Sequence, residues 1–420
     1  MPAFAIESLI KTALLLGALM TAAAYLVLME RKVAAWIQDR RGPNRVGIPL
    51  TNIKLFGLGQ PLADGLKFIL KEEYTPGHVD RFLYTLAPVV ILTSALAVFA
   101  VIPFGSVLWA IDALGPEPVR LIAAPAVDVG VVYVFAVSSI AVYGVILGGW
   151  ASNNKYSFMG GLRSSAQLIA YELPLGLGLL GVVLASGSLR LDTIIDAQAH
   201  SGVWNIFWQP IGFVVFAVAA CAEAARLPFD LPEAEQELIG GYHTEYSGIR
   251  LLMYLVAEFL HMVTAAFLIV ILFLGGWHFW GLTSAAFWGA GDAAGNIPWW
   301  LAIGQVFVLA IKILIVILFF MLVRWSWPRF RFDQLMQLAW KVMLPLGLIN
   351  LVVVAVLVEF REPIVAALGG GFFGALILVA LSWLIAVVSW TGIALAAPLK
   401  FDNRPRLEVA VDAYDGRSLN

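Results

Sequence analysis

The 420-residue chain contains a single cysteine, Cys221, and five histidines. One cysteine excludes a disulfide framework within the chain and any iron–sulfur or zinc site that needs four thiolates. The histidines lie on different segments, without a facing pair for a haem or a spacing typical of zinc sites. We therefore expect no metal and no redox centre in this chain, and Cys221 itself is most simply a small buried apolar residue.

Charged residues are also scarce. They make up 13% of the chain, whereas 61% of the residues are hydrophobic, a balance typical of polytopic membrane proteins. Apolar stretches long enough to cross a hydrocarbon core of about 30 Å predict an all-α fold with about nine transmembrane helices. These stretches run roughly over 8–29, 82–104, 127–149, 165–187, 205–226, 249–274, 299–324, 342–360 and 372–396.

The distribution of basic residues predicts the orientation in the membrane. If the N-terminus lies outside, 21 of the 26 lysines and arginines fall in inner segments, and Lys11, Arg120, Arg190 and Arg361 fall in outer ones. This asymmetry follows the positive-inside rule. We expect the N-terminus outside and the C-terminus in the cytoplasm.

Residues 223–248, EAARLPFDLPEAEQELIGGYHTEYSG, interrupt the apolar pattern with charge. Charge beside a bilayer core is costly and therefore indicates a function. Pro228 and Pro232 break any helix there, so this irregular backbone is expected to face protein or water. Beside the lone Arg226, the stretch carries six carboxylates: Glu223, Asp230, Glu233, Glu235, Glu237 and Glu245.

Ionisable residues also lie within the predicted spans: Glu172, Glu258 and Lys312, with Glu223 near the end of another span. A carboxylate at such depth costs about 2.5–3.5 kcal/mol on insertion scales, so each should face the bundle interior and find a partner or a proton. The three acids suit a proton relay; the alternative is a structural network in which Glu172 or Glu258 pairs with Lys312. His261 shares a helical face with Glu258 and suits a hydrogen-bonded structural role, the commoner case, or proton relay.

The segment 30–81 combines basic residues, Gly-Pro turn chemistry and an amphipathic pattern. It predicts a helix lying at the cytoplasmic membrane surface. Asp64 and Lys67 share one face of this helix and could line a pocket that admits an apolar molecule from the bilayer; the alternative is a basic membrane anchor alone. The apolar positions of the pattern are Leu62, Leu66, Phe68, Ile69 and Leu70.

Four stretches carry distinctive motifs. They are ERK, RRGPNRVG, QPLADGLKF and KEE within 30–73, GGWASNNKYSFMGGLRSSAQLIAYELP at 148–174, AEAARLPFDLPEAEQELIGGYHTEYSG at 222–248 with AEFLHM at 257–262, and PRFRFDQLMQLAWKVMLPL at 328–346. Together they resemble the H subunit of proton-pumping NADH-quinone oxidoreductase, respiratory complex I, over about residues 1–360.

The resemblance implies a subunit of the bacterial cell inner membrane that forms the membrane part of a ubiquinone or menaquinone chamber. Its partners would be the peripheral quinone-module subunits and the small membrane subunits that lead to the antiporter-like pumps. FMN and the iron–sulfur clusters would belong to partner subunits. The acidic funnel between chamber and pumps would consist of Glu172, Glu223, Asp230, Glu233, Glu235 and Glu258. The residues that line the quinone path or its charged surround would be Arg31, Arg45, Asp64, Lys67, Arg226 and Arg329 or Arg331.

Two regions depart from the family pattern. Residues 48–59, IPLTNIKLFGLG, are longer than the usual run, which predicts a re-angled entry helix. Residues 361–420 would add a ninth span and a cytoplasmic tail to an H-subunit-like domain at 1–360. Two rival functions stay open. One is the equivalent anchor of a membrane-bound hydrogenase or related energy-converting complex. The other is a stand-alone cation/proton transporter, which would need two pseudo-symmetric halves that the sequence does not show.

Overall fold

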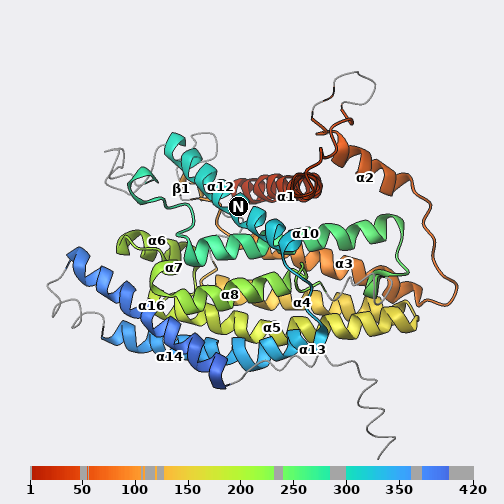
Figure 1. The fold of residues 1–420 in the computed structure, drawn as a ribbon. Helices are drawn as coiled ribbons and strands as arrows, with labels where there is room; N and C mark the ends of the chain where they lie inside the picture. Colours follow the sequence, from red (N-terminus) through yellow and green to blue (C-terminus); the bar gives the residue numbers. More distant parts are fainter. Residues whose placement is uncertain are drawn as a thin grey trace, which may run out of the picture.

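The computed structural model describes residues 2–47, 54, 56–105, 107–108, 119–120, 127–230, 240–283, 299–360 and 371–396. Within these ranges the chain is a bundle of helices (Figure 1). A pair of two-residue antiparallel strands, β1 (Val107–Leu108) and β2 (Val119–Arg120), pairs Val107 with Arg120. The expected all-α fold is confirmed.

Eight helical segments of the described chain are long and apolar enough to cross a membrane. Shorter helices connect them: α6 (Leu191–Ser201), α7 (Asn205–Trp208), η2 (Gly241–His243) and η3 (Trp280–Thr283). The eight long segments are α1 (Pro2–Ile37), α3 (Arg81–Ala97) with η1 (Val98–Ala100), α4 (Gly130–Ala151), α5 (Lys155–Ser186), α10 (Gly248–Phe273), α12 (Trp299–Ser326), the run α13 (Phe332–Gln337), η4 (Leu338–Met343) and α14 (Leu344–Glu359), and α16 (Gly371–Ala396).

The predicted stretch 205–226 differs from the other spans because it is broken. The chain forms α7, leaves the helical conformation at Gln209, and continues as α8 (Pro210–Glu223). Proline disfavours the helical conformation of the residue before it and begins helices readily, which accounts for the break at this point. The 14 residues of α8 extend for about 21 Å, less than a bilayer core.

The amphipathic pattern at Leu62–Leu70 does form a helix, α2 (Gln60–Leu70), which projects from the bundle in Figure 1. None of its residues is buried, and Leu62, Leu66 and Ile69 are each about half exposed or more. The helix begins with Pro61 in its first turn, a position that proline favours. An exposed apolar face of this kind fits contact with a membrane surface.

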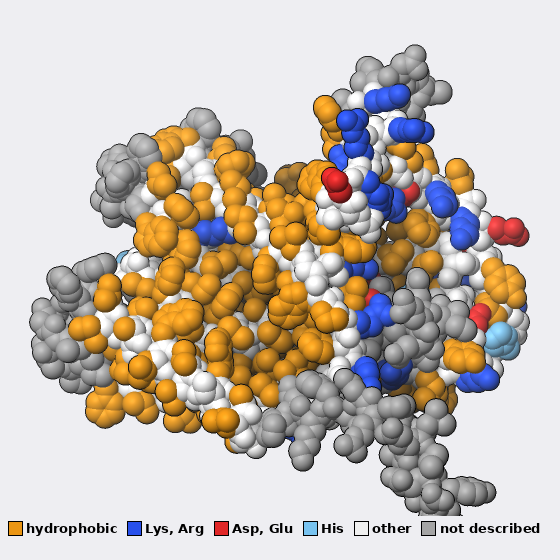
Figure 2. Space-filling view, viewed as in Figure 1, with side chains coloured by type: hydrophobic (Ala, Val, Ile, Leu, Met, Phe, Trp, Pro, Cys, Tyr) orange, Lys and Arg blue, Asp and Glu red, His pale blue; other side chains and the backbone are white. Residues whose placement is uncertain are grey.

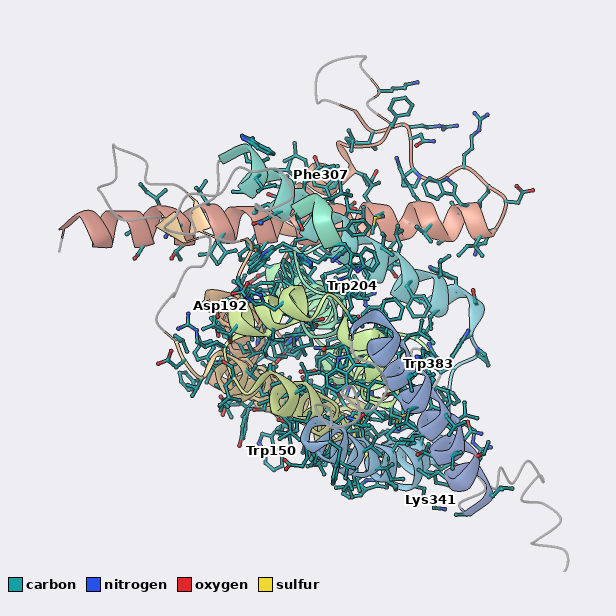
Figure 3. All side chains as sticks on the ribbon, turned by 90° about the vertical axis from the view of Figure 1, so that its left-hand side faces the viewer. Trp150, Asp192, Trp204, Phe307, Lys341 and Trp383 are labelled. Atoms are coloured by element: carbon teal, nitrogen blue, oxygen red, sulfur yellow. The ribbon has the colours of Figure 1, made fainter. Side chains whose placement is uncertain are left out.

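Most of the long helices run between two ends of the bundle, whereas α1 lies across them (Figures 1 and 3). At one end, which we call the Asn154 end, Asn154 and Asp80 cap the starts of α5 and α3 with their side-chain oxygens. At the other, the Trp204 end, Gly187 and Gly202 close α5 and α6 in the left-handed conformation. Figure 2 shows that apolar side chains cover most of the side of the bundle that faces the viewer, and that basic side chains gather near α2.

Helix α10 is the most deeply buried of the eight and forms the centre of the bundle. It packs against α3, α8, α12 and α1. In Figure 3, which looks from the Trp204 end, α1 crosses over one side of the bundle and α16 covers another. The approach of α4 to α5 depends on glycine: a Cβ on Gly149 would stand 2.8 Å from the Ser157 carbonyl oxygen and 3.3 Å from Gly161 Cα.

Candidate functional site

A cavity of about 890 Å³ opens between α1, α2, α10 and the end of α12. Its walls combine apolar side chains with a charged zone, as is usual for sites that bind an apolar molecule with a polar group. The apolar part includes Met20, Ala23, Val27, Phe68, Leu252, Leu255, Val256 and Phe259. The charged part includes Glu30, Arg31, Arg40, Arg41, Asp64, Arg226, Glu258 and Arg324. We call this space the large cavity.

Arg226 is the centre of the charged zone. Its Nη1 donates to Glu30 Oε2 at 3.1 Å, and its Nε lies 3.2 Å from Glu258 Oε1. Arg324 donates to the same Glu30. The guanidinium of Arg226 also stacks over the ring of Phe259, 4.3 Å from its centroid. Buried charges need such pairing, and this charged cluster of two acids and two bases carries no net charge.

Local sequence positions each member of the charged cluster. Glu30 lies on the last turns of α1, and Glu258 lies ten residues into α10. Arg226 follows the end of α8, where Ala225 adopts a positive φ of 50° and turns the chain. Arg226 is 4% exposed, so the chain at this turn faces protein, one of the two surroundings, protein or water, predicted for the irregular segment.

A second, smaller cavity of about 60 Å³ lies behind the charged cluster. Its acidic side chains come from three helices: Glu172 from α5, Glu223 from α8 and Glu258 from α10. Its volume is enough for a few water molecules at about 10–15 Å³ each, and its walls are polar enough to hold them. The other polar lining residues are Ser138, Ser139, Ser164, Tyr242, Tyr254 and His261. We call this space the inner cavity.

Glu258 connects the two spaces. Of the described residues, it alone lines both the large cavity and the inner cavity. His261, one turn further along α10, lines the inner cavity, and its Nε2 has no hydrogen-bond partner among the described residues. Both roles considered for His261, hydrogen-bonded structural group and proton relay, therefore stay predictions. The predicted gathering of Glu172, Glu223 and Glu258 is what the structure shows.

Lys312 does not join this network, so the alternative in which it pairs with Glu172 or Glu258 is wrong. Its ammonium donates to the carbonyl oxygens of Leu274, Gly276 and His278 at the Trp204 end. It also lies 4.3 Å from the centroid of the Trp204 ring. Figure 3 places Trp204 at the end that faces the viewer. The sequence predicted the depth of Lys312 in its span, but it could not show which backbone carbonyls accept hydrogen bonds from its ammonium.

The other predicted site residues differ in where they lie. Arg31 and Asp64 line the large cavity and form an ion pair of 2.7 Å between α1 and α2. Lys67, Arg45, Arg329 and Arg331 are not among the residues that line it. Asp230 lines neither cavity; it is buried and pairs with Arg329 at 3.1 Å, and Arg331 pairs with Asp333 at the surface. Glu233 and Glu235 lie outside the described residues, as do Glu237 and most of the 48–59 segment.

Glu30 and Arg324 are site residues that the sequence analysis missed. Both stand where an apolar stretch ends, and at such positions a charged residue ordinarily marks the membrane boundary. The sequence did contain one clue to their pairing: Glu30 and Arg324 carry opposite charges and stand at the ends of two spans on the same predicted side of the membrane. Among the described residues no group of three or more histidine, cysteine, aspartate or glutamate side chains could hold a metal ion.

The fold and the site define a polytopic helical membrane protein in which a buried charged cluster separates a large, partly apolar cavity from an inner acidic one. The family model described as NADH dehydrogenase matches residues 10–355. The chain is 44% identical over 353 residues to the first of the NADH-quinone oxidoreductase H subunits of Geobacter metallireducens, covering 84% of this chain and 97% of that one. For the H subunits of the same enzyme in Flavobacterium johnsoniae and Protochlamydia amoebophila the identities are 41% and 45%, covering 87% and 80% of this chain and 99% and 92% of theirs.

The chain therefore belongs to the NADH dehydrogenase family, as an H subunit of the complex I type. It is a membrane subunit of an oxidoreductase complex.

Proposed function

We propose that this chain forms the membrane part of a quinone chamber and couples quinone reduction to proton pumping through the charged cluster. The large cavity would hold the quinone, with its apolar walls against the ring and tail and its charged zone near the reacting oxygens. Electrons would come from NADH through FMN and iron–sulfur clusters of partner subunits. The relatives carry the name NADH-quinone oxidoreductase, which supports this substrate class.

The observation that carries the proposal is the position of Glu258 between the two cavities. Quinone reduction consumes two electrons and two protons, so charge changes in the large cavity during each turnover. Arg226 contacts Glu30 on one side and Glu258 on the other. A negative charge beside Arg226 weakens its hold on Glu258, and a carboxylate without its cation takes up a proton more readily.

Protonation of Glu258 then alters the inner cavity, where Glu172 and Glu223 respond to its charge. The large cavity and the inner cavity are thus coupled by one ion pair with two arrangements, as any energetic coupling requires. Toward the remaining membrane subunits, the inner acids would pass the change on as proton movement. The Asn154 end would face the cytoplasm, because the positive-inside asymmetry of the sequence assigns it there.

Replacing Glu258 with Gln in the assembled complex tests the proposal. Glutamine keeps the shape of the side chain but cannot change its charge, so we expect quinone-linked NADH oxidation and proton pumping both to fall. NADH oxidation with an artificial acceptor, which reports on the partner subunits, should stay at the wild-type level. Glu359→Gln is the matched control, because Glu359 is an exposed glutamate at the end of α14 and lines neither cavity. Wild-type pumping in the Glu258→Gln complex would refute the coupling role.

A further inference from the structure

Four tyrosines lie together between the inner cavity and the Asn154 end: Tyr84, Tyr242, Tyr246 and Tyr254, here called the tyrosine cluster. The rings of Tyr84 and Tyr246 are stacked, with centroids 4.1 Å apart and planes 6° apart. Tyr246 meets Tyr254 edge to face at 4.9 Å, and Tyr254 meets Tyr242 at 5.2 Å. Tyr84, Tyr246 and Tyr254 are 0%, 4% and 2% exposed. The cluster is thus a continuous buried column from α3 to α10.

One side of the column reaches the surface at the Asn154 end. The hydroxyl of Tyr84 donates to the backbone carbonyl of Glu245 at 2.6 Å. The carboxylate of Glu245, which is only partly buried, accepts from the side-chain amide of Asn154 at 2.5 Å. The guanidinium of Arg250 lies 5.2 Å from the centroid of the Tyr84 ring. Charged and polar groups accessible to water therefore stand at this side.

The other side of the column opens on the inner cavity. Tyr242 and Tyr254 line that cavity together with Glu258. Tyr254 precedes Glu258 by four residues, so the two side chains share one face of α10.

The hydroxyls of Tyr246 and Tyr254 interact with each other, and that of Tyr246 also interacts with Ser152, but none of these contacts has the geometry of a complete hydrogen bond. Leaving a buried hydroxyl unsatisfied costs about 1–3 kcal/mol, and bound water is the usual remedy. Both hydroxyls lie against Gly148: a Cβ there would stand 2.4 Å from Tyr254 Oη and 3.7 Å from Tyr246 Oη. The glycine keeps the space around them open.

The hydroxyls of two other tyrosines of this chain differ from those of Tyr246 and Tyr254. Tyr171 is equally buried, and its hydroxyl donates to the carbonyl of Leu335 at 3.0 Å. Tyr133 likewise donates to the carbonyl of Ala97. Burial raises the pKa of Tyr246 to about 12, so its hydroxyl keeps its proton at neutral pH and remains a donor.

We propose that the tyrosine cluster is a proton route from the surface at the Asn154 end into the inner cavity, separate from the large cavity. This inference rests on the proposed function, in which the inner acids change protonation during turnover. A hydroxyl on the route accepts a proton from a water on its surface side and releases its own proton toward the cavity. The tyrosine is neutral before and after, one water on the surface side has lost a proton, and Glu258 has gained one.

Tyr254→Phe in the assembled complex tests the route, with Tyr133→Phe as the matched control. Phenylalanine keeps the ring packing and removes only the hydroxyl. We expect the rate of quinone-linked proton pumping to fall about tenfold or more, in line with the loss of a proton-transfer group. The solvent deuterium isotope effect on turnover should change, whereas the KM for quinone and NADH oxidation with an artificial acceptor should not. Tyr133→Phe should match the wild type in every measurement.

The outcomes separate this inference from the proposed function. If Glu258→Gln slows pumping and Tyr254→Phe does not, the proposed function stands and the tyrosine route is refuted. If neither variant changes pumping, both are refuted. Tyr246→Phe is the second test, because it removes the neighbouring hydroxyl of the column. Removing such poorly bonded hydroxyls should not cost stability, so failure of both tyrosine variants to assemble would show a structural role and overturn the assignment.

Discussion

At the scale of single residues, Arg226 has the most demanding position in the molecule. It is buried between two carboxylates and against an aromatic ring. The carboxylates of Glu30 and Glu258 are themselves almost enclosed, with side chains 11% and 12% exposed. Removing Arg226 therefore leaves two carboxylates to which water has little access. Of the described arginines, only Arg324, which pairs with Glu30, remains to balance their charge.

Arg226→Gln should consequently destabilise the subunit, because breaking a buried ion pair by removing one partner costs about 3–5 kcal/mol. The thermal unfolding temperature of the purified complex measures this effect. Adding Glu258→Gln to the same chain removes one of the two stranded charges and should restore part of the loss. Equal losses in the single and double variants would contradict the charge argument, since residues in contact are expected to couple.

For Lys312, also at the scale of single residues, we predict that replacement lowers the stability of the complex and leaves its activity unchanged. Lys312→Met removes the donor from three backbone carbonyls and the cation from the Trp204 ring. Buried acceptors left unsatisfied cost about 1–3 kcal/mol each, so the complex should lose thermal stability. Quinone-linked activity per assembled complex should be unchanged, because Lys312 lines neither the large cavity nor the inner one. Lys341→Met, at an exposed lysine, should leave both quantities unchanged.

At the scale of elements, α2 is held to α1 by polar contacts. Arg31 pairs with Asp64, and Gln60 donates to the other oxygen of the same carboxylate. The side chains of the pair are 49% and 25% exposed, so the bond is worth only about 0–1 kcal/mol of stability. The role of the ion pair is to position α2, which forms one wall of the large cavity.

Asp64→Asn should therefore raise the KM for quinone and leave the thermal stability of the complex nearly unchanged. Arg31→Gln should give the same rise, and the double variant should show little more than either single change, since both remove one interaction. Steady-state kinetics with a water-soluble quinone measures all three. A fall in kcat at constant KM would contradict this account, because it would mean that the Arg31–Asp64 pair contributes to the reaction and does not merely position α2.

The elements also show how far sequence reasoning reached. Apolar length gave all eight of the described spans almost directly, because a bilayer core sets a minimum length that few soluble segments meet. It could not show that Gln209 leaves the helix, since Pro210 is compatible both with a kink and with a new helix start. Likewise, depth in a span identified Glu172 and Glu258, but their gathering around the inner cavity depends on helix rotation, which tertiary packing decides. Glu30 and Arg324 were missed for another reason, because a charged residue at the end of an apolar stretch ordinarily marks the membrane boundary.

At the scale of the whole molecule, α16 stands apart from the functional region. It packs on α7, α8 and α14, and the indole of Trp383 donates to the Phe207 carbonyl. The family match ends at residue 355, before this helix begins. Figure 3 shows Trp383 on the outside of the bundle, away from α1. Neither the large cavity nor the inner cavity takes a lining residue from α16.

A chain that ends after Phe360 should therefore assemble and retain quinone-linked NADH oxidation and proton pumping. It should lose some thermal stability, because the apolar contacts of α16 with α8 and α14 disappear. Activity staining and proton-pumping assays on membranes containing the shortened subunit provide the measurement. Loss of pumping with normal assembly would assign α16 a part in coupling that its position does not suggest.

The central claim, that Glu258 carries a change of charge from the large cavity to the inner one, is tested most directly by infrared difference spectroscopy. The purified complex is reduced with NADH in the presence of quinone, and the carboxyl stretching region is compared between wild type and variants. The account predicts a carboxyl band that appears on turnover, disappears in Glu258→Gln and persists in the Glu359→Gln control. An unchanged band pattern in Glu258→Gln would show that Glu258 keeps its protonation state throughout, and it would contradict the account.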